Sequence, residues 1–388
     1  MFKQFESFVR SMTGEGFVPL HTPQFNGNEK AYVVDTIDST FVSSVGVYVT
    51  DFELAMAKYT GVKHAIAVTN GTAALHLSLI GVGVQSGDEV ITQALTFVAT
   101  SNAIHYCQAS PVYLDVDADT MGLSPTAVKD WLLQNAVIEN GSCINRHTRA
   151  KISACVVMHT FGHPARLDEL KMVCDEYGII LVEDAAESLG SLYKGKHTGQ
   201  VGKVAALSFN GNKIITTGGG GMILTNDSEL AQQLKHLSTT AKVAHPWQYE
   251  HDQIGYNYRM PNLNAALGLA QLEGIESELA AKQELTLRYK GFFDQLANSD
   301  DSSSADRVQF IEQPDFACSN YWLQTIKFES REQQQTFLAQ SNEAGIMTRP
   351  IWQLNNTLPM YRHCQTDELV NSIDLANTIV NIPSSIRL

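Results

Sequence analysis

V-E-D-A-A-E-S-L-G at residues 182–190 and S-F-N-G-N-K-I-I-T-T-G-G-G-G at residues 208–221 belong together in this chain. The first stretch places a carboxylate, Asp184, at the end of the apolar run I-I-L-V. The second places an amine, Lys213, in a loop between two apolar runs and shortly before four consecutive glycines. Glycines allow close backbone approach and dihedral angles that other residues avoid. The two stretches therefore predict neighbouring strand ends that carry charged side chains.

An acid at a strand end and a lysine on a later loop are the two groups that pyridoxal phosphate chemistry needs. The lysine amine forms a Schiff base with the aldehyde of the cofactor. The carboxylate pairs with the pyridine nitrogen and keeps it protonated, so that the ring accepts electrons. Taken alone, Lys213 is typical of a surface lysine and Asp184 of a helix cap or solvated strand end. Their combination favours the catalytic interpretation, in which a desolvated Lys213 also exchanges protons with the substrate.

Short apolar runs alternate with helical patterns across the first two thirds of the chain. The strand candidates are H-A-I-A-V-T, D-E-V-I-T-Q, P-V-Y-L-D-V, A-C-V-V-M-H, I-I-L-V-E-D, V-A-A-L-S-F and G-M-I-L-T-N. Helices are predicted over 73–80, 124–134 and 167–177. This alternation predicts an α/β fold with a mainly parallel sheet covered on both faces. Ligands of such sheets bind at the carboxyl ends of the strands, where Asp184 and Thr72 fall.

Four more residues are candidates for the same site. Thr72 lies in N-G-T-A-A-L, which follows a strand and opens a helix, so its hydroxyl and the first backbone N–H groups favour an anion. Ser208 offers a second hydroxyl. Phe97 is placed to cover one face of a ring, and Glu187 to reach its phenolic oxygen or the substrate. The alternatives are a plain helix cap, a core aromatic residue and a surface carboxylate.

The second part of the chain differs from the first. Residues 241–255 are polar and predict a loop, whereas Pro261 to about Ala297 reads as one long helix that bridges two domains. We expect a large cofactor-binding α/β domain over residues 1–260 and a smaller C-terminal α+β domain over residues 261–388. The smaller domain is built from the loop at 299–306, the strand run Y-W-L-Q-T-I-K-F, a helix near 331–343 and the segment I-M-T-R-P-I-W.

Composition excludes several classes of protein. The chain has 388 residues, is 44% hydrophobic and carries a net charge of -14, which argues against a nucleic-acid-binding surface. Its six cysteines are scattered, and their spacing is typical neither of zinc ligands nor of a dense disulfide framework. We therefore expect reduced thiols and no metal site. No signal peptide and no apolar run of about 20 residues is present, so a cytoplasmic protein without a membrane span is expected.

Five motifs together resemble the sugar-nucleotide aminotransferases of the DegT/DnrJ/StrS type. They are N-G-T-A-A-L-H-L, G-D-E-V-I-T-Q-A-L-T-F-V-A-T, V-E-D-A-A-E-S-L-G, S-F-N-G-N-K-I-I-T-T-G-G-G-G and G-Y-N-Y-R-M-P-N-L-N-A-A-L-G-L-A-Q-L. The resemblance runs from about Pro23 to Ile382. It implies the fold-type I architecture of pyridoxal phosphate enzymes, with a mainly parallel seven-stranded sheet in the large domain.

The resemblance also implies a role for individual residues. Lys213 is the lysine that bonds to the cofactor, Asp184 binds the ring nitrogen and Phe97 stacks on the ring. The phosphate is held by Thr72, Ala73 and Ser208, and Asn257 reaches the phosphate of the neighbouring subunit, which implies a homodimer with shared active sites. Many members carry Gln or His where this chain has Glu187, so at this position the chain departs from the pattern of the family.

The implied substrates are glutamate, as amino donor, and a nucleotide-linked keto-sugar. Glu187 is similar to the residue found in perosamine synthases and in 4-aminotransferases of the legionaminic and bacillosamine type. The segments F-V-S-S-V-G-V-Y-V, M-H-T-F-G-H-P-A and R-P-I-W-Q-L resemble the legionaminic-type group. That group acts at C4 of a UDP-linked 4-keto-6-deoxy-N-acetylhexosamine and serves surface-glycan (lipopolysaccharide or O-antigen) biosynthesis. The candidates for sugar contacts are His163, Arg349 and Trp352. For each of them the alternative is a purely structural role.

Other interpretations stay open beside this one. A GDP-perosamine-synthase-like enzyme or a 3-aminotransferase would act on another nucleotide keto-sugar, and a non-catalytic regulator would bind the cofactor alone. A dehydratase of the same fold would carry histidine in place of Lys213. A dehydrogenase is disfavoured, because the glycine-rich G-V-G-V-Q-S-G at 81–87 lies after a helix and before a strand, the reverse of the required order.

Overall fold

The computed structural model of the chain describes residues 1–297 and 308–386. Its helices are α1 Phe2–Thr13, α2 Glu29–Asp38, α3 Val47–Thr60, α4 Gly71–Gly81, α5 Val98–Tyr106, α6 Pro125–Asn135, α7 Leu167–Tyr177, α8 Ser228–Ser238, α9 Asn262–Glu273, α10 Ile275–Ala297, α11 Arg331–Glu343 and α12 Val370–Thr378. The predicted loop at 299–306 lies outside the described residues.

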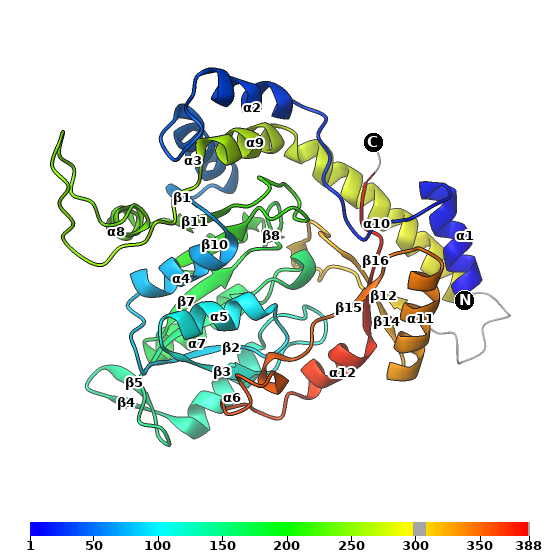
Figure 1. Cartoon of the computed structure of the whole chain (residues 1–388). Helices are drawn as coiled ribbons and strands as arrows, with labels where there is room; N and C mark the ends of the chain where they lie inside the picture. Colours follow the sequence, from blue (N-terminus) through cyan, green and yellow to red (C-terminus); the bar gives the residue numbers. More distant parts are fainter. Residues whose placement is uncertain (298–307, 387–388) are drawn as a thin grey trace.

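A seven-stranded sheet with the order β1-β11-β10-β7-β6-β2-β3 forms the centre of the molecule (Figure 1). Its strands are β1 His64–Val68, β2 Glu89–Gln93, β3 Ser110–Leu114, β6 Ile152–Met158, β7 Ile180–Asp184, β10 Val204–Ser208 and β11 Gly221–Thr225. Only β11 runs antiparallel to its neighbours within this sheet. The predicted seven-stranded, mainly parallel sheet is therefore confirmed.

Helices cover both faces of this sheet, which explains why its strands read as continuous apolar runs. Every residue of β2, β6 and β11 is buried. Leu75 of α4 and Leu234 of α8 belong to the apolar cluster on one face, and Leu132 of α6 and Leu170 of α7 to a cluster on the other. Because both faces are buried, the ends of the strands are the places where polar side chains gather.

The prediction of one continuous helix from Pro261 to about Ala297 is wrong. The structure divides it into α9 and α10 at Gly274, which has φ -93 and ψ 0. The N–H of Gly274 donates to the carbonyl oxygen of Gln271, which tightens the last turn of α9 instead of continuing it. Glycine is a weak helix former, which favours a break between α9 and α10 at this position.

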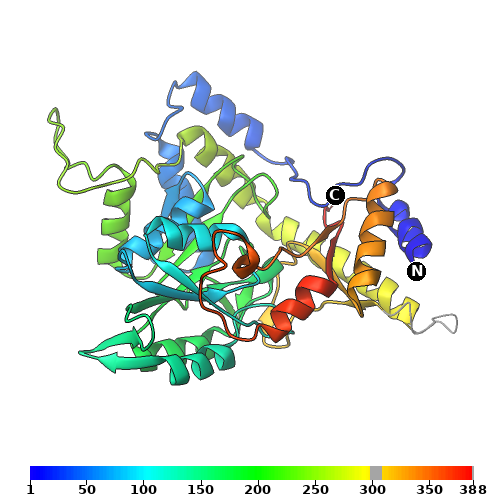
Figure 2. The same cartoon turned by 60° about the horizontal axis from the view of Figure 1, so that its bottom comes forward.

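A four-stranded antiparallel sheet of order β12-β14-β16-β15 forms a second unit beside the large sheet (Figure 2). Its strands are β12 Val308–Phe310, β14 Gln324–Phe328, β15 Arg349–Pro350 and β16 Ile379–Ile382. The helix predicted near 331–343 is α11. Phe5 and Val9 of α1 share the apolar cluster of this unit with Phe293 and Phe337. The N-terminal helix thus packs with the C-terminal sheet, and the predicted division at residue 260 stays a prediction.

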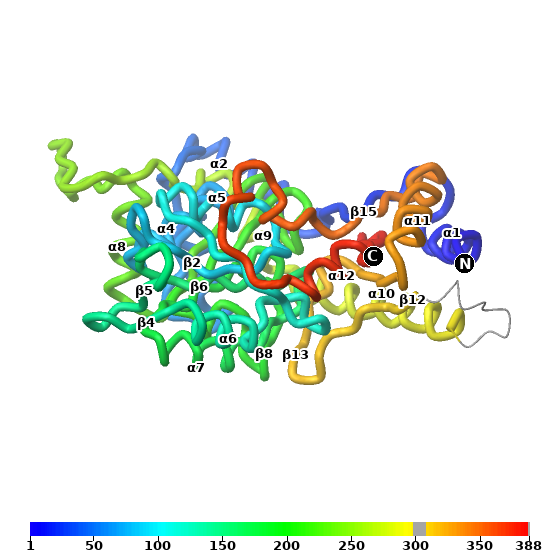
Figure 3. The backbone as a smooth tube through the Cα atoms, turned by 90° about the horizontal axis from the view of Figure 1, so that it is seen from below, coloured from blue at the N-terminus to red at the C-terminus, as the bar shows by residue number. Residues whose placement is uncertain are grey.

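A long connection between β15 and α12 runs along the edge of the large sheet where β2 and β3 end (Figure 3). The N–H of Asn355 donates to the carbonyl oxygen of Ala94, and the N–H of Tyr113 donates to that of Gln365. The side chain of Tyr361 donates to Asn102 at 2.6 Å. These contacts bring side chains of the C-terminal unit to the carboxyl ends of the central strands.

Smaller strands complete the structure: the hairpin of β4 Ala136–Glu139 and β5 Ser142–Asn145, and a sheet of β8 Leu192–Tyr193, β9 Lys196–His197 and β13 Ala317–Cys318. All six cysteines lie in the described residues and are free thiols. Within the described ranges, no helix combines the length and the apolar character that a membrane crossing requires.

Candidate functional site

A cavity of about 360 Å³ lies at the carboxyl ends of the central strands. Its lining contains most of the residues predicted from the sequence, namely Thr72, Phe97, Asp184, Glu187, Ser208, Lys213 and Trp352. The residues come from segments far apart in the chain. They meet because parallel strands bring their carboxyl ends to one edge of the sheet, while the C-terminal unit closes the cavity from the other side.

Lys213 holds its amine between a carboxylate and an aromatic ring. Its Nζ lies 3.1 Å from Oε1 of Glu187 and 3.8 Å from the ring centroid of Trp322. The side chain is 14% exposed, so it is largely buried but keeps some contact with solvent. A lysine in such a place is accessible to a ligand in the cavity and poor in competing water contacts, which suits a nucleophile.

Asp184 ends β7 and is buried at the floor of the cavity. Its Oδ2 accepts a hydrogen bond from the hydroxyl of Thr100 at 2.7 Å, and its Oδ1 accepts one from the N–H of Ala186 at 3.2 Å. Burial raises the pKa of Asp184 above its ordinary value, against the effect of these hydrogen bonds. A cationic group placed beside this carboxylate would therefore be bound strongly, because it would relieve the cost of burial.

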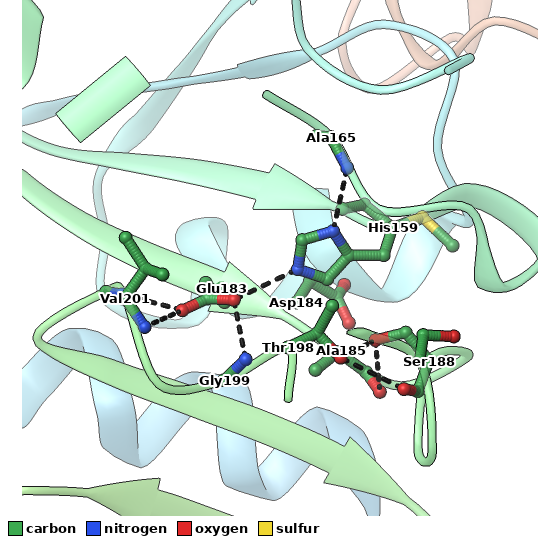
Figure 4. A network of polar contacts seen from close by, with 12 residues as sticks. His159, Ala165, Glu183, Asp184, Ala185, Ser188, Thr198, Gly199 and Val201 are labelled. Atoms are coloured by element: carbon green, nitrogen blue, oxygen red, sulfur yellow. Dashed lines mark hydrogen bonds and ion pairs between the residues drawn. The ribbon is translucent and has the colours of Figure 1, made fainter. Parts of the chain in front are cut away.

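A buried pair behind Asp184 fixes the strand end (Figure 4). Nε2 of His159 lies 3.1 Å from Oε2 of Glu183. Nδ1 of His159 accepts the N–H of Ala165, so the ring proton resides on Nε2 and is donated to Glu183. The N–H of His159 donates to the carbonyl oxygen of Asp184. The carboxylate of Glu183 also accepts backbone N–H groups from Gly199, Val201 and Gly202.

This network keeps a charge inside the protein at low cost. Burial alone would raise the pKa of Glu183, but the hydrogen bonds from His159 and from the backbone N–H groups outweigh it and lower the pKa. A fully satisfied buried network of this kind is rigid. Through the backbone of His159 and Glu183 it fixes the position of Asp184.

The opposite end of the cavity is built for an anion. Helix α4 begins at Gly71, and the first N–H groups of a helix have no partner inside the helix. A Cβ on Gly71 would lie 2.8 Å from Cβ of Ser208, so glycine lets the helix end approach the second hydroxyl. A Cβ on Gly221 would lie 2.4 Å from the backbone of Asn70, which shows how the glycine run permits this packing. Helix dipole and hydroxyls together suit a phosphate.

Glu187 is almost completely buried, with 2% of its side chain exposed. Its Oε2 accepts the N–H of Phe161 at 2.9 Å, while Oε1 faces Lys213. Phe161 has φ 56, a left-handed conformation that is unusual for a bulky residue and that presents its N–H to the carboxylate. Burial raises the pKa of Glu187 to about 7. This carboxyl group can therefore gain or lose a proton near neutral pH beside the amine.

Replacing Glu187 by Gln should change the pH dependence of stability in the cofactor-free protein. An unfolded glutamate has a pKa of about 4.5, whereas the folded value is about 7. Between these values the unfolded chain binds fewer protons than the folded one, so stability falls as pH rises through that window. Glu187→Gln should remove this fall, which amounts to about 3 kcal/mol when the shift is converted at 1.36 kcal/mol per unit.

Urea unfolding of cofactor-free wild type and variant at about pH 5 and about pH 7.5 measures the difference. The exposed Glu343→Gln is the matched control and should leave the wild-type pH dependence unchanged. An identical pH dependence for wild type and Glu187→Gln would contradict the conclusion that burial of Glu187 outweighs its contacts with Lys213 and Phe161.

Four predicted residues lie off the cavity lining in the single described chain. Ala73 donates its N–H to Oδ1 of Asn70, so this N–H is engaged in a helix cap. Arg349 is exposed and donates to Asn342. Asn257 is exposed and accepts from Arg259. His163 is fully buried against Tyr321, and burial lowers its pKa to about 4. The roles predicted for these residues stay predictions.

Three residues of the site escaped the sequence analysis. Trp322 lies over the amine of Lys213, Thr100 donates to Asp184, and Phe161 donates to Glu187. Trp322 and Thr100 lie in the segments Y-W-L-Q-T-I-K-F and L-T-F-V-A-T quoted above. Nothing in either segment indicates that Trp322 contacts Lys213 or that Thr100 contacts Asp184. Only the left-handed turn in M-H-T-F-G-H could have been suspected, from the glycine that follows Phe161.

The residues of the cavity fit pyridoxal phosphate. An anion-binding helix end, a buried carboxylate and a sheltered lysine surround one cavity, and the half-exposed ring of Phe97 lies on its wall. When bound, this cofactor supplies an aldehyde for an amine and a ring that accepts electrons. Thr72 and Ser208 would hold its phosphate, Asp184 its ring nitrogen and Lys213 its aldehyde carbon.

The chain is similar in sequence to known aminotransferases. The model of the DegT/DnrJ/EryC1/StrS aminotransferase family matches residues 23–388. The chain is 34% identical to a GDP-perosamine synthase of Escherichia coli O157:H7, over 95% of this chain and 93% of the relative. It is 36% identical to EpsN, a candidate pyridoxal phosphate-dependent aminotransferase of Bacillus subtilis (strain 168), over 88% of this chain and 83% of the relative.

Solved structures share the fold. The aminotransferase TlmJ from Streptoalloteichus hindustanus superposes with a TM-score of 0.83 at 25% identity, covering 95% of this chain and 94% of the other. An aminotransferase from Brucella abortus gives a TM-score of 0.80 at 26% identity, covering 92% and 90%. These neighbours confirm the predicted fold class, a fold-type I aminotransferase.

Proposed function

This chain belongs to the DegT/DnrJ/EryC1/StrS aminotransferase family, and we propose that it transfers the amino group of glutamate to C4 of a nucleotide-linked 4-keto-6-deoxy sugar. It is a pyridoxal phosphate-dependent aminotransferase that acts on nucleotide-linked keto-sugars. The observation that carries the proposal is Lys213, held 3.1 Å from Glu187 in a cavity that also contains Asp184.

The residues of the cavity would divide the work. Lys213 would attack the aldehyde and later carry the proton between the substrate carbon and the cofactor, which a positioned amine can do. Glu187 would exchange protons with that amine, because its pKa of about 7 leaves it partly protonated near neutrality. Asp184 would keep the ring nitrogen protonated. Trp322 and Trp352 would exclude water from the reacting groups.

The proposed acceptor is a UDP-linked 4-keto-6-deoxy-N-acetylhexosamine, supported by the segments F-V-S-S-V-G-V-Y-V and M-H-T-F-G-H-P-A. A GDP-linked sugar is the second candidate. It is supported by relatives named GDP-perosamine synthase, in Escherichia coli O157:H7 and in Vibrio cholerae, at 34% and 35% identity. His163, Arg349 and Trp352 remain the proposed sugar contacts. The free thiols suit the reducing cytosol, which is the proposed location.

Turnover in the reverse direction distinguishes these acceptors. The purified holoenzyme is mixed with 2-oxoglutarate and one amino-sugar nucleotide at a time, and glutamate formation is measured. We expect turnover with a UDP-linked 4-amino-6-deoxy-N-acetylhexosamine. Preference for the GDP-linked 4-amino sugar would select the second candidate, and preference for a 3-amino sugar would refute transfer at C4. A cofactor-loaded protein inert to glutamate and to every nucleotide would support the regulator instead.

We further propose that the active unit is a dimer. Helices α2 and α3 and the loop between them expose the apolar side chains Val34, Ile37, Phe41, Val42, Val45, Val47 and Leu54. The segment around residues 243–254 projects from the body and exposes Trp247, Tyr249 and Ile254 (Figures 1 and 2). Large apolar surfaces of this kind are typical of interfaces. Asn257, which follows the projecting segment, would then reach the phosphate in the partner subunit.

Complementation tests the shared site. Lys213→Ala removes the reactive amine, and Asn257→Asp places a carboxylate where a phosphate would lie across the interface. A heterodimer of the two variants has one site with both lesions and one with neither. Random mixing at equal amounts should therefore restore about a quarter of the wild-type sites, since two equivalent sites form across a two-fold axis.

A matched mixture controls for nonspecific rescue. Lys213→Ala mixed with Asp184→Asn leaves one lesion in each site, because both residues belong to the same chain's cavity, and should stay inactive. Heterodimers of Lys213→Ala and Asn257→Asp that form but remain inactive would exclude the composite site. A monomeric active enzyme in sedimentation would exclude it as well.

A further inference from the structure

Trp322 stands at the junction between the C-terminal unit and the reactive lysine. It precedes β14, is 4% exposed and lines the cavity. Its Nε1–H donates to the carbonyl oxygen of Asn212 at 2.6 Å. Its ring face lies 3.8 Å from Nζ of Lys213. One side chain therefore holds both the backbone next to Lys213 and the amine itself.

Trp322 is anchored from behind by two polar side chains. Its N–H donates to Oδ1 of Asn320 at 2.8 Å, and Nδ2 of Asn320 donates to the carbonyl oxygens of Glu187 and Leu189. The carbonyl oxygen of Trp322 accepts from Nζ of the fully buried Lys282 at 3.0 Å. Asn320 thus links the loop that carries Glu187 to the segment that carries Trp322, so both contacts of the amine share one anchor.

The geometry limits what the free amine can do. A cation over an aromatic face is attracted by the negative face of the ring, most strongly for an indole away from water. Glu187 supplies the second attraction, at 3.1 Å from Oε1. The two groups hold the amine in one place.

We propose that Trp322 is a positioning residue for Lys213, whose ring face keeps the free amine protonated and directed toward Glu187. The proposal rests on the role proposed for Lys213 in the preceding section. It predicts that the ring face, more than the hydrogen bond of Nε1, determines the reactivity of the free amine.

The test uses the full-length protein freed of cofactor, so it is independent of any sugar nucleotide. Trace acetylation with acetic anhydride, read by mass spectrometry, compares Lys213 with the exposed Lys30 as internal standard. Only a neutral amine reacts, so the acetylation rate of Lys213 is followed from about pH 7.5 up to its high-pH plateau. The plateau reports access alone, and the rate at about pH 7.5 divided by the plateau, the ratio used below, isolates protonation.

Two variants separate the ring face from the hydrogen bond. Trp322→Met removes both and should raise the ratio for Lys213 about 10-fold, while Trp322→Phe keeps a ring and should stay within about 3-fold of wild type. An unchanged ratio in Trp322→Met would overturn the proposal. An equal rise in Trp322→Phe would also overturn it, because the hydrogen bond would then be the cause.

A reciprocal measurement covers the case in which Trp322→Met does not fold. Lys213→Met removes the cation and leaves the ring, so the indole emission of the protein should change. In a Trp322→Phe background the same substitution should leave the emission unchanged. A change of equal size in both backgrounds would overturn the contact. Peptide mapping of the bound cofactor tests the role of Lys213 independently. If another lysine carries the cofactor, the proposed function of Lys213 fails, whatever the acetylation and emission results are.

Discussion

Lys213→Ala should reduce amino transfer by at least about 10⁴-fold, the upper range for removing a positioned proton-transfer group, because the variant also loses its nucleophile. No other amine takes its place on the cavity lining of the described residues. The helix end at Gly71, Ser208 and Asp184 remain, so the variant should still bind the cofactor. Activity and cofactor binding should therefore separate in this variant.

Reduction with borohydride followed by peptide mapping identifies the lysine directly. The cofactor should be found on the peptide that contains Lys213. Lys282 is the most informative alternative, because burial lowers its pKa to about 7 and its Nζ lies just behind Trp322. Lys282 donates to backbone carbonyl oxygens and lies off the cavity lining, so we expect no label there. A label on Lys282 would refute the assignment of Lys213.

The sequence predicts the sheet and the charged residues at its edge for one physical reason. Strands buried on both faces must be apolar along most of their length, so the polar residues that follow such a run, as Glu183 and Asp184 follow I-I-L-V, mark a strand end. Parallel strands bring those ends together. Lys213 and Thr72 could therefore be placed near Asp184 without any knowledge of the order of the strands.

The remaining contacts could not be predicted, because they depend on how distant segments pack. Trp322 reaches Lys213 only because the C-terminal unit lies against the carboxyl ends of the sheet, and no local pattern encodes that contact. The break at Gly274 was missed because one glycine between two amphipathic stretches reads as a tolerated helix residue. Asn257 cannot be tested in one chain, since its predicted partner belongs to a second copy.

Asp184→Asn should slow the reaction with glutamate by at least about 100-fold, the lower end for a well-placed catalytic group. Asparagine keeps the shape of the side chain, and its oxygen can still accept from either Thr100 or Ala186, so the fold should survive. What it loses is the negative charge, and an amide cannot hold a ring nitrogen protonated.

The matched control for this substitution is Thr100→Val, which removes the 2.7 Å hydrogen bond to Oδ2 and leaves the charge of Asp184 in place. We expect it to cost far less activity than Asp184→Asn. Stopped-flow absorbance after mixing each holoenzyme with glutamate measures both rates. If Asp184→Asn stays within a few-fold of wild type, the carboxylate does not act through its charge. If Thr100→Val is as slow as Asp184→Asn, the position of the carboxylate matters as much as its charge, and the buried network around His159 and Glu183 becomes the feature on which the chemistry depends.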